Sequence, residues 1–343
     1  MHFQVVIVGA GPAGLSCAKV LSQNGIRTLI IDKKARVGPK VCAGGLTWSG
    51  LARRIPEGLI EKSFPVQNIK TPFQNISVRS PHPIIVTVNR EKLGQLMLEQ
   101  ALGSGAEILT STRVWKISGH TLDLQHIQNH QQQQVQFDNL VGADGSNSLI
   151  RGHLSLPSTR IGIGINYQIP GENDKMEWHL DSSFFRNGYG WIFPHRGSLS
   201  VGAYVDRSVM KAQTLKNNLI HWADGLGIDL RDKKCRAEYI NFDYRGWDFG
   251  HIFLAGDAAG LASALTGEGI YPAIVSGEIV AQKIIDPKCD HSRINRLIRK
   301  LKLHARIVHL TGKNRLVNSL LRELAVFGLR IGILDFRQLE MAD

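Results

Sequence analysis

The sequence predicts an α/β fold: a parallel β-sheet flanked by helices, with a second β-rich region inserted into it and a helical C-terminal segment. Apolar runs of strand length at residues 3–8, 28–31, 139–143 and 252–255 are typical of buried strands. Short alternating stretches within residues 161–205 favour a second sheet. Residues 291–343 have the apolar spacing of amphipathic helices.

The first strand leads directly into a glycine-rich turn and a helix that extends to about residue 23. The turn reads Gly9, Ala10, Gly11, Pro12, Ala13, Gly14. Gly9 permits the turn, Gly11 lets a pyrophosphate approach the backbone, and Gly14 lets the helix pack closely on the strand. The helix N-terminus offers free N–H groups to phosphates. Because Asp32 ends the second strand and can bind a ribose hydroxyl, we expect a Rossmann-like dinucleotide-binding unit.

Two further glycine motifs follow buried strands far along the chain. They read Gly142-Ala143-Asp144-Gly145 and Gly256-Asp257, and the second is followed by Leu265-Thr266-Gly267-Glu268-Gly269-Ile270. Asp257 can hold a hydroxyl group of a ligand, and Gly267 and Gly269 allow the backbone to approach it closely. The helix predicted from Ile270 directs its positive end toward the same point.

With these three motifs the chain resembles the flavoprotein superfamily that includes p-hydroxybenzoate hydroxylase. The resemblance implies an FAD-binding domain of the GR2 or p-hydroxybenzoate hydroxylase type. It also implies that FAD is contacted at Ala143, Asp144, Gly145, Gly256, Asp257, Gly267, Gly269 and Ile270, by Arg90 at the start of a helix, and by the backbone of Val114 near adenine.

Two other motifs make the resemblance narrower. Residues 39–45 read Pro-Lys-Val-Cys-Ala-Gly-Gly and are similar to the cysteine-bearing loop of geranylgeranyl reductases, while residues 189–194 match their YxWxFP signature. These enzymes use FAD to add hydrogen across isoprenoid double bonds. The resemblance places the loop beside the cofactor, with contacts from Lys33, Lys40, Cys42, Ala43 and Gly44.

The aromatic motif can be interpreted in two ways from the residues alone. Tyr189, Trp191 and Phe193 alternate along a strand, so their rings share one face. That face either lines an apolar tunnel for a prenyl chain or forms ordinary sheet core. With Pro194, these residues are the predicted substrate site.

Cys42 is the candidate catalytic residue. Reduction of an isolated alkene needs a hydride at one carbon and a proton at the other, and Cys42 is expected to help deliver the proton. Lys40 is expected to tune its thiol, and the facing rings to stabilise developing positive charge. The alternative is that Cys42 is a buried apolar residue.

The nucleotide-binding pieces are spread along the chain. We expect an FAD-binding domain at 1–45, 89–158 and 245–290, a substrate domain at 46–88 and 159–244, and a C-terminal helical segment at 291–343. Residues 47–60 are expected to be helical.

Composition limits the partners. The chain of 343 residues has a formal net charge of +12 but no nucleic-acid-binding signature, so an anionic lipid or diphosphate is preferred over nucleic acid. There is no signal-peptide pattern, no apolar run long enough to span a bilayer, no CxxC pair and no metal motif. We therefore expect a cytoplasmic protein. Its basic C-terminal helices either pack on the body or contact the inner membrane surface.

The leading hypothesis is an FAD-dependent reductase of an isoprenoid lipid or diphosphate. Only one dinucleotide fingerprint is present, so NAD(P)H, if it is the reductant, has no Rossmann domain of its own. Reduced ferredoxin or another donor is the alternative. The alternatives are an FAD-dependent monooxygenase of a small aromatic compound and a non-catalytic flavin- or lipid-binding protein.

Overall fold

The first strand of the chain lies within an eight-stranded sheet. The structure, a computed structural model, describes residues 1–52, 55–312 and 314–342. In this sheet β1 lies between β2 and β11 and is parallel to both. The path runs in the order β17-β18-β11-β1-β2-β8. Its strands are β1 (His2–Val8), β2 (Thr28–Ile31), β8 (Glu107–Leu109), β11 (Gln132–Gly142), β17 (Asp248–Phe249) and β18 (Ile252–Leu254).

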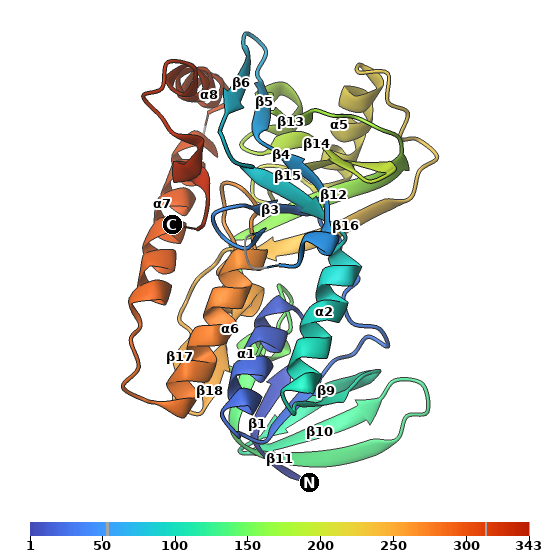
Figure 1. Cartoon of the computed structure of the whole chain (residues 1–343), viewed down its shortest axis with the longest axis vertical. Coiled ribbons are helices and arrows are strands. Elements are labelled where there is room, and N and C mark those ends of the chain that lie inside the picture. Colours follow the sequence, from blue (N-terminus) through green and yellow to red (C-terminus); the bar gives the residue numbers. More distant parts are fainter. Residues whose placement is uncertain (53–54, 313, 343) are drawn as a thin grey trace.

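The remaining two strands, β9 (Thr112–Ser118) and β10 (Thr121–His126), form an antiparallel extension of β11. Three long helices lie beside one another against the sheet (Figure 1): α1 (Pro12–Gln23), α2 (Arg90–Gly103) and α6 (Ile270–Ile285). Helix α1 packs on both of the others. Gly277 makes the α1–α6 crossing close, because a Cβ there would lie 2.2 Å from the Ala13 carbonyl oxygen.

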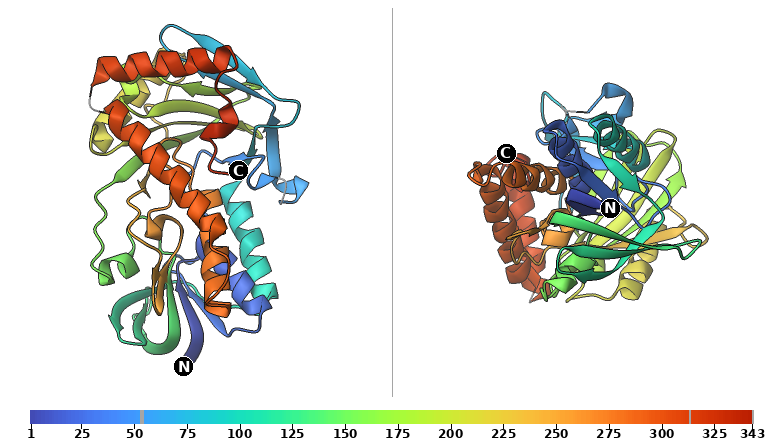
Figure 2. Two further views of the ribbon diagram at one scale, coloured as in Figure 1. Left: turned by 90° about the vertical axis from the view of Figure 1, so that its left-hand side faces the viewer. Right: turned by 90° about the horizontal axis from the view of Figure 1, so that it is seen from below.

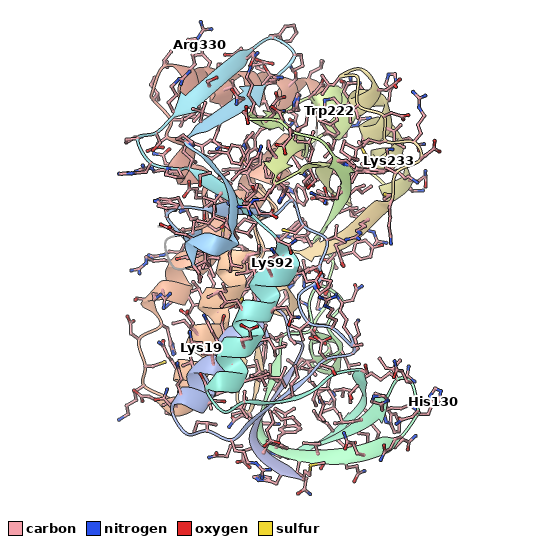
Figure 3. The ribbon with its side chains drawn as sticks, turned by 45° about the vertical axis from the view of Figure 1, so that its right-hand side comes forward. Lys19, Lys92, His130, Trp222, Lys233 and Arg330 are labelled. Carbon is pink, nitrogen blue, oxygen red and sulfur yellow. The ribbon has the colours of Figure 1, made fainter. Side chains whose placement is uncertain are left out.

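A seven-stranded sheet forms the other half of the molecule, in the order β16-β12-β15-β14-β13-β5-β6. Its strands are β5 (Val66–Lys70), β6 (Asn75–Arg79), β12 (Ile161–Pro170), β13 (Met176–His179), β14 (Tyr189–His195), β15 (Ser198–Asp206) and β16 (Cys235–Asn241). Helices α4 (Ser182–Phe185) and α5 (Ala212–Asp224) pack on this sheet. Figure 3 shows Trp222 of α5 in this half, where its ring meets His179 and Phe185.

A small sheet of β3 (Gly45–Thr47), β7 (Ile85–Val88) and β4 (Ile60–Phe64) connects the two halves. Short helices complete the body: η2 (Glu57–Leu59), α3 (Leu149–His153) and η3 (Gly256–Ala259). The C-terminal part consists of α7 (Ser292–Gly312), α8 (Arg315–Arg330) and η4 (Phe336–Leu339). Helix α7 runs along one side of the molecule, and α8 lies against β6 at the far end of the second sheet (Figures 1 and 2).

The predicted fold class is confirmed, including the parallel sheet, the second sheet and the helical C-terminal segment. The helix expected at 47–60 is wrong. Residues 45–47 and 60–64 are strands that pair with β7, and the described residues between them form turns and the short η2. Pairing with a buried strand outweighs local helix propensity here. Positions 53–54 of that expected helix lie outside the described residues.

Candidate functional site

A cavity of about 600 Å³ is lined by residues of both large sheets. Of the predicted cofactor residues, all but Gly14 and Gly44 reach its wall. The members of this set come from the β1–α1 turn, the end of β2, the Cys42 loop, the start of α2, β9, the end of β11, η3 and the start of α6. Segments that are far apart in the sequence therefore meet at one site.

The glycine turn after β1 is shaped by contacts that leave no room for side chains. Gly9 has a φ of 108°, and a Cβ there would lie 2.3 Å from the Ala143 carbonyl oxygen. A Cβ on Gly14 would lie 2.0 Å from the Gly9 carbonyl oxygen. Gly14 thus serves helix packing. Gly11 faces open space within the cavity, where a ligand can meet its backbone.

Asp32 lies at the rim of this turn and holds it in shape. Its carboxylate accepts hydrogen bonds from the backbone N–H of Ala10 at 2.7 Å and of Lys34 at 2.8 Å. Both Asp32 and Lys33 line the cavity. The same carboxylate therefore orders the loop and remains beside the ligand space.

Asp144 and Asp257 face the cavity from the ends of β11 and β18. The Oδ2 atom of Asp144 accepts from the Leu149 N–H at 2.6 Å, whereas its Oδ1 is buried with no hydrogen-bond partner among the described residues. Burial raises the pKa of Asp144. The Oδ2 atom of Asp257 accepts from Lys40 Nζ at 3.1 Å and from Ser146 Oγ at 3.2 Å.

Two cations on the cavity wall, Lys40 and Arg90, have different surroundings. Lys40 is paired with Asp257, whose charge raises the lysine pKa. Arg90 is the cation whose charge interacts with Cys42. Arg90 is buried, its pKa is lowered by loss of hydration, and its Nε and Nη1 atoms have no hydrogen-bond partner in the part of the chain that the structure describes. The tuning of Cys42 by Lys40 stays a prediction, and the observed ion-pair partner of Lys40 is Asp257.

The aromatic residues of β14 lie on the cavity wall together with Trp178 of β13. The Trp178 ring is 5.3 Å from that of Tyr189 and 4.7 Å from that of Phe193. Pro194 does not line the cavity. Strand alternation places its ring on the face opposite to that of Phe193. Its backbone carbonyl accepts a hydrogen bond from Thr87 Oγ1 at 2.8 Å. The assignment of Pro194 to the substrate site stays a prediction.

Sequence analysis missed several residues of this site. Trp178 and Tyr204 line the cavity, and Tyr204 donates to the Ala264 carbonyl at 2.9 Å. Glu268, within the third motif, lines it as well and accepts from the Met341 N–H at 3.1 Å. Loss of hydration raises the pKa of Glu268 to about 7. Alternation along residues 176–179 was a usable signal for Trp178, but nothing local predicts that Met341 returns to the third motif.

Comparison with known proteins agrees with this geometry. Residues 2–168 match the model of the FAD binding domain family. The chain is 29% identical to digeranylgeranylglycerophospholipid reductase 3 of Methanosphaera stadtmanae, with 81% of this chain and 76% of that protein covered. It is 27% identical to geranylgeranyl diphosphate reductase of Rhodobacter capsulatus, with 82% and 75% covered. It is an FAD-dependent oxidoreductase with geranylgeranyl reductase homologues.

The fold of this flavoprotein is also found in a solved structure. A geranylgeranyl bacteriochlorophyll reductase-like protein from Thermoplasma acidophilum superposes with a TM-score of 0.74 at 23% identity, covering 94% of this chain and 87% of that one. The cavity of this flavoprotein fits FAD. Its wall carries buried polar atoms, on Asp144 and Arg90, that lack partners among the described residues, and a glycine turn open to a ligand.

Among the described residues, no group of three or more His, Cys, Asp or Glu side chains is arranged to hold a metal ion. Within the same residues, no helix has both the length and the hydropathy required to cross a bilayer.

Proposed function

We propose that this FAD-dependent oxidoreductase reduces carbon–carbon double bonds of an isoprenoid lipid or diphosphate. The proposal is supported by the composition of the cavity wall, which combines polar residues with aromatic side chains. Cys42 and Arg90 lie in the same space as Tyr189, Trp191, Phe193 and Trp178. An apolar aromatic wall suits a prenyl chain, and the polar turn suits a dinucleotide.

Different residues of the cavity wall are proposed to bind different parts of FAD. The β1–α1 turn and the N-terminus of α1 would bind the pyrophosphate, Asp32 a ribose hydroxyl, and Asp257 a ribityl hydroxyl. Arg90, buried and unpaired among the described residues, offers donors to an anionic or carbonyl oxygen. The N-terminus of α6, beside Gly267 and Gly269, would stabilise negative charge on the reduced cofactor.

The proposed chemistry needs a proton donor and groups that stabilise a developing positive charge. Bound FAD supplies the hydride. The Cys42 thiol lies on the cavity wall, where it can give its proton to the other alkene carbon. The ring faces of Tyr189 and Trp191 stabilise the positive charge that develops there. The pKa of Tyr189 is raised by burial, so its hydroxyl stays protonated and keeps its hydrogen bond to the Thr266 carbonyl.

Replacement of Cys42 tests this role. We expect Cys42→Ala to retain FAD, as measured by its absorbance, and to lose at least about a hundredfold of the reduction of geranylgeranyl diphosphate with dithionite as reductant, a loss typical of removing a positioned acid. Cys289→Ala is the matched control, since Cys289 does not line the cavity. Undiminished reduction by Cys42→Ala would remove the thiol from the chemistry.

A monooxygenase of a small aromatic compound remains the second enzyme class on this fold. Oxygen-dependent formation of a hydroxylated product, with no reduction of prenyl substrates, would favour it. The physiological reductant proposed here is NAD(P)H or reduced ferredoxin. Stopped-flow reduction of the bound flavin by each donor separates these two, and the absence of reduction by either would favour a flavin- or lipid-binding role.

We further propose that α8 places the protein on an anionic membrane surface. One face of α8 exposes apolar side chains: Leu316 is 80% exposed, Leu320 61% and Leu324 55%, and Phe327 and Ile331 continue the same face. Residues 291–343 contain eleven Lys and Arg against four Asp and Glu. An amphipathic helix in a basic segment matches an anionic bilayer in both charge and apolar area.

Flotation with vesicles tests the membrane proposal. We expect the wild-type protein to float with vesicles that contain about a third phosphatidylglycerol, and the double variant Leu320→Glu/Leu324→Glu to remain at the bottom. Leu226→Glu, at an exposed apolar position following α5, is the matched control and should float. Flotation of the double variant at the wild-type level would refute the role of α8.

A further inference from the structure

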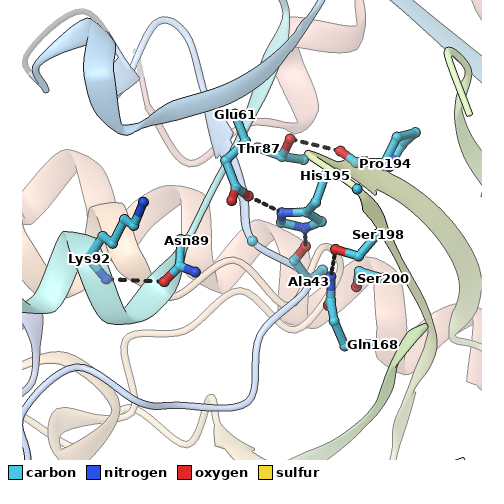
Figure 4. Close-up of polar contacts among 12 residues, drawn as sticks. Ala43, Glu61, Thr87, Asn89, Lys92, Gln168, Pro194, His195, Ser198 and Ser200 are labelled. Atoms are coloured by element: carbon cyan, nitrogen blue, oxygen red, sulfur yellow. Dashed lines mark hydrogen bonds and ion pairs between the residues drawn. The ribbon is translucent and has the colours of Figure 1, made fainter. Parts of the chain in front are cut away.

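The side chain of His195, at the end of β14, lies directly against the loop that carries Cys42. Its Nε2 atom is 2.9 Å from the Ala43 carbonyl oxygen, and its Nδ1 atom is 2.5 Å from Glu61 Oε2 of β4 (Figure 4). The ring packs on Gly44 so closely that a Cβ there would lie 2.4 Å from His195 Cε1. The site therefore includes a contact that the aromatic signature does not contain.

The two partners of His195 are both acceptors. A backbone carbonyl only accepts, and an ionised carboxylate only accepts, whereas a neutral imidazole has a single N–H to give. An ionised Glu61 and a neutral His195 together have one N–H for two acceptors. Both contacts can be hydrogen bonds only if the Glu61–His195 pair holds one further proton. That proton lies on the imidazole or on Glu61, and in either case the Nε2–H remains directed at Ala43.

A second chain of hydrogen bonds fixes the preceding carbonyl of the same loop. Asn166 of β12 donates through Nδ2 to the Cys42 carbonyl at 3.2 Å. Its Oδ1 accepts from Ser200 Oγ at 2.7 Å, and Ser200 in turn accepts from Trp191 Nε1 at 3.0 Å. Asn166, Ser200 and Trp191 are buried. Two successive carbonyls of the loop, those of Cys42 and Ala43, are thus held by separate strands of the second sheet.

We propose that Glu61 and His195 act as a proton-dependent clamp on the Cys42 loop, with Asn166 as its proton-independent partner. These are positioning residues: they act on the backbone of the loop and set where the thiol stands. The inference rests on the proposed function only in giving Cys42 a chemical role. The clamp itself concerns contacts within this chain.

Few other charges face the clamp. Strand β7 has no charged residue, and β15 has Asp206 at the end far from His195. On β4 the neighbour of Glu61 is Lys62, which is paired with Glu172. The loop contributes the Cys42 thiol and Lys40, which is paired with Asp257, and Arg90 interacts with Cys42. The proton that completes both contacts of the clamp is the one shared by Glu61 and His195.

The rate of Cys42 alkylation by iodoacetamide, measured across pH by peptide mass spectrometry on the FAD-loaded protein, tests the clamp. In the wild-type protein we expect the pH profile to contain the thiol ionisation and a second ionisation that frees the loop. Glu61→Gln should remove the second one, because the amide can donate to Nδ1 while the single ring proton stays on Nε2. His195→Leu should raise the alkylation rate about tenfold at the low-pH end, the effect of losing one hydrogen bond.

The remaining variants separate positioning from general damage. Asn166→Asp cannot donate to the Cys42 carbonyl, so it should raise alkylation by a pH-independent factor. Gln168→Ala is the matched control, because Gln168 bonds only to Ser198 at this edge of the sheet and should leave the profile unchanged. Profiles of Glu61→Gln and Asn166→Asp that superpose on the wild type would overturn the proposal, whatever the fate of His195→Leu. Since alkylation needs no prenyl substrate, this outcome is distinguishable from failure of the proposed reductase activity.

Discussion

At the residue scale, glycines of one motif have opposite physical roles. A Cβ on Gly14 would collide with the backbone of the β1–α1 turn, whereas a Cβ on Gly11 would meet open space. The sequence pattern alone treats both as parts of one fingerprint. The structure separates a residue required for folding from one required for binding.

We expect Gly14→Ala to destabilise the fold by about 1–3 kcal/mol, since the new methyl group would force the helix from the Gly9 carbonyl. Gly11→Ala should leave the thermal midpoint of the FAD-free protein within error of the wild type and weaken FAD binding. Thermal unfolding and FAD titration of both variants measure this contrast. Equal thermal midpoints for the two variants would contradict the assigned roles.

Glu268 provides a prediction for pH. Its pKa in the folded protein is about 7, above that of an unfolded chain, so the native state retains a proton that the unfolded state releases. The contribution to stability is complete at pH below about 4.5 and declines as the pH rises to 7. In urea titrations at pH 5 and 7.5, Glu268→Gln should reduce the wild-type loss of stability between the two values. An unchanged pH dependence would argue that the carboxyl is ionised throughout.

At the element scale, β14 joins the two functional loops. Tyr189 donates to the Thr266 carbonyl in the third motif, and His195 at the other end of the strand bonds to Ala43 in the Cys42 loop. Tyr204 of the neighbouring β15 donates to the carbonyl of Ala264, directly before Leu265 of the third motif. The strands that carry the aromatic wall therefore also position the loops proposed to contact FAD.

We expect Tyr189→Phe and Tyr204→Phe each to weaken FAD binding about fivefold, because each loses one hydrogen bond worth about 1 kcal/mol that orders the loop. The rings remain, so packing is preserved. Isothermal titration with FAD measures the effect, and the double variant should show whether the two bonds act on one loop. An affinity equal to the wild type in the double variant would exclude this positioning role.

At the scale of the whole molecule, the cavity is built by both large sheets, and the C-terminal end contacts one of its wall residues, Glu268. Glu340 bonds to Ser49, Lys300 donates to the Ala342 carbonyl at 2.6 Å, and Met341 binds Glu268. Binding at such a site couples the halves, because a ligand that contacts both stabilises each against local unfolding.

FAD is therefore expected to protect both sheets. At a hundred times its dissociation constant it should add about 2.7 kcal/mol to the free energy of unfolding. Hydrogen exchange should slow in β1 and β11 and also in β12 and β14. Protection confined to the eight-stranded sheet would contradict a cofactor shared between the two halves.

Sequence reasoning reached most of the cavity wall because its motifs have local physical causes. The turn at Gly9, the carboxylates at strand ends and the ring alternation of β14 each follow from geometry within a few residues. The residues that it missed, among them Glu61, Asn166, Tyr204 and Met341, acquire their roles from contacts between distant segments. The ion pair of Lys40 with Asp257 was missed for the same reason, since Asp257 lies 217 positions away.

The sequence by itself determined the fold class, the cofactor family and the candidate cysteine, because each depends on short motifs whose spacing sets the backbone shape. Only the tertiary structure decided that Lys40 pairs with Asp257, that Pro194 lies outside the cavity wall, and how the Ala43 carbonyl is held. Those outcomes depend on how strands far apart in the chain pack together. Burial then changes the charge and hydrogen-bond partners of the side chains that meet there.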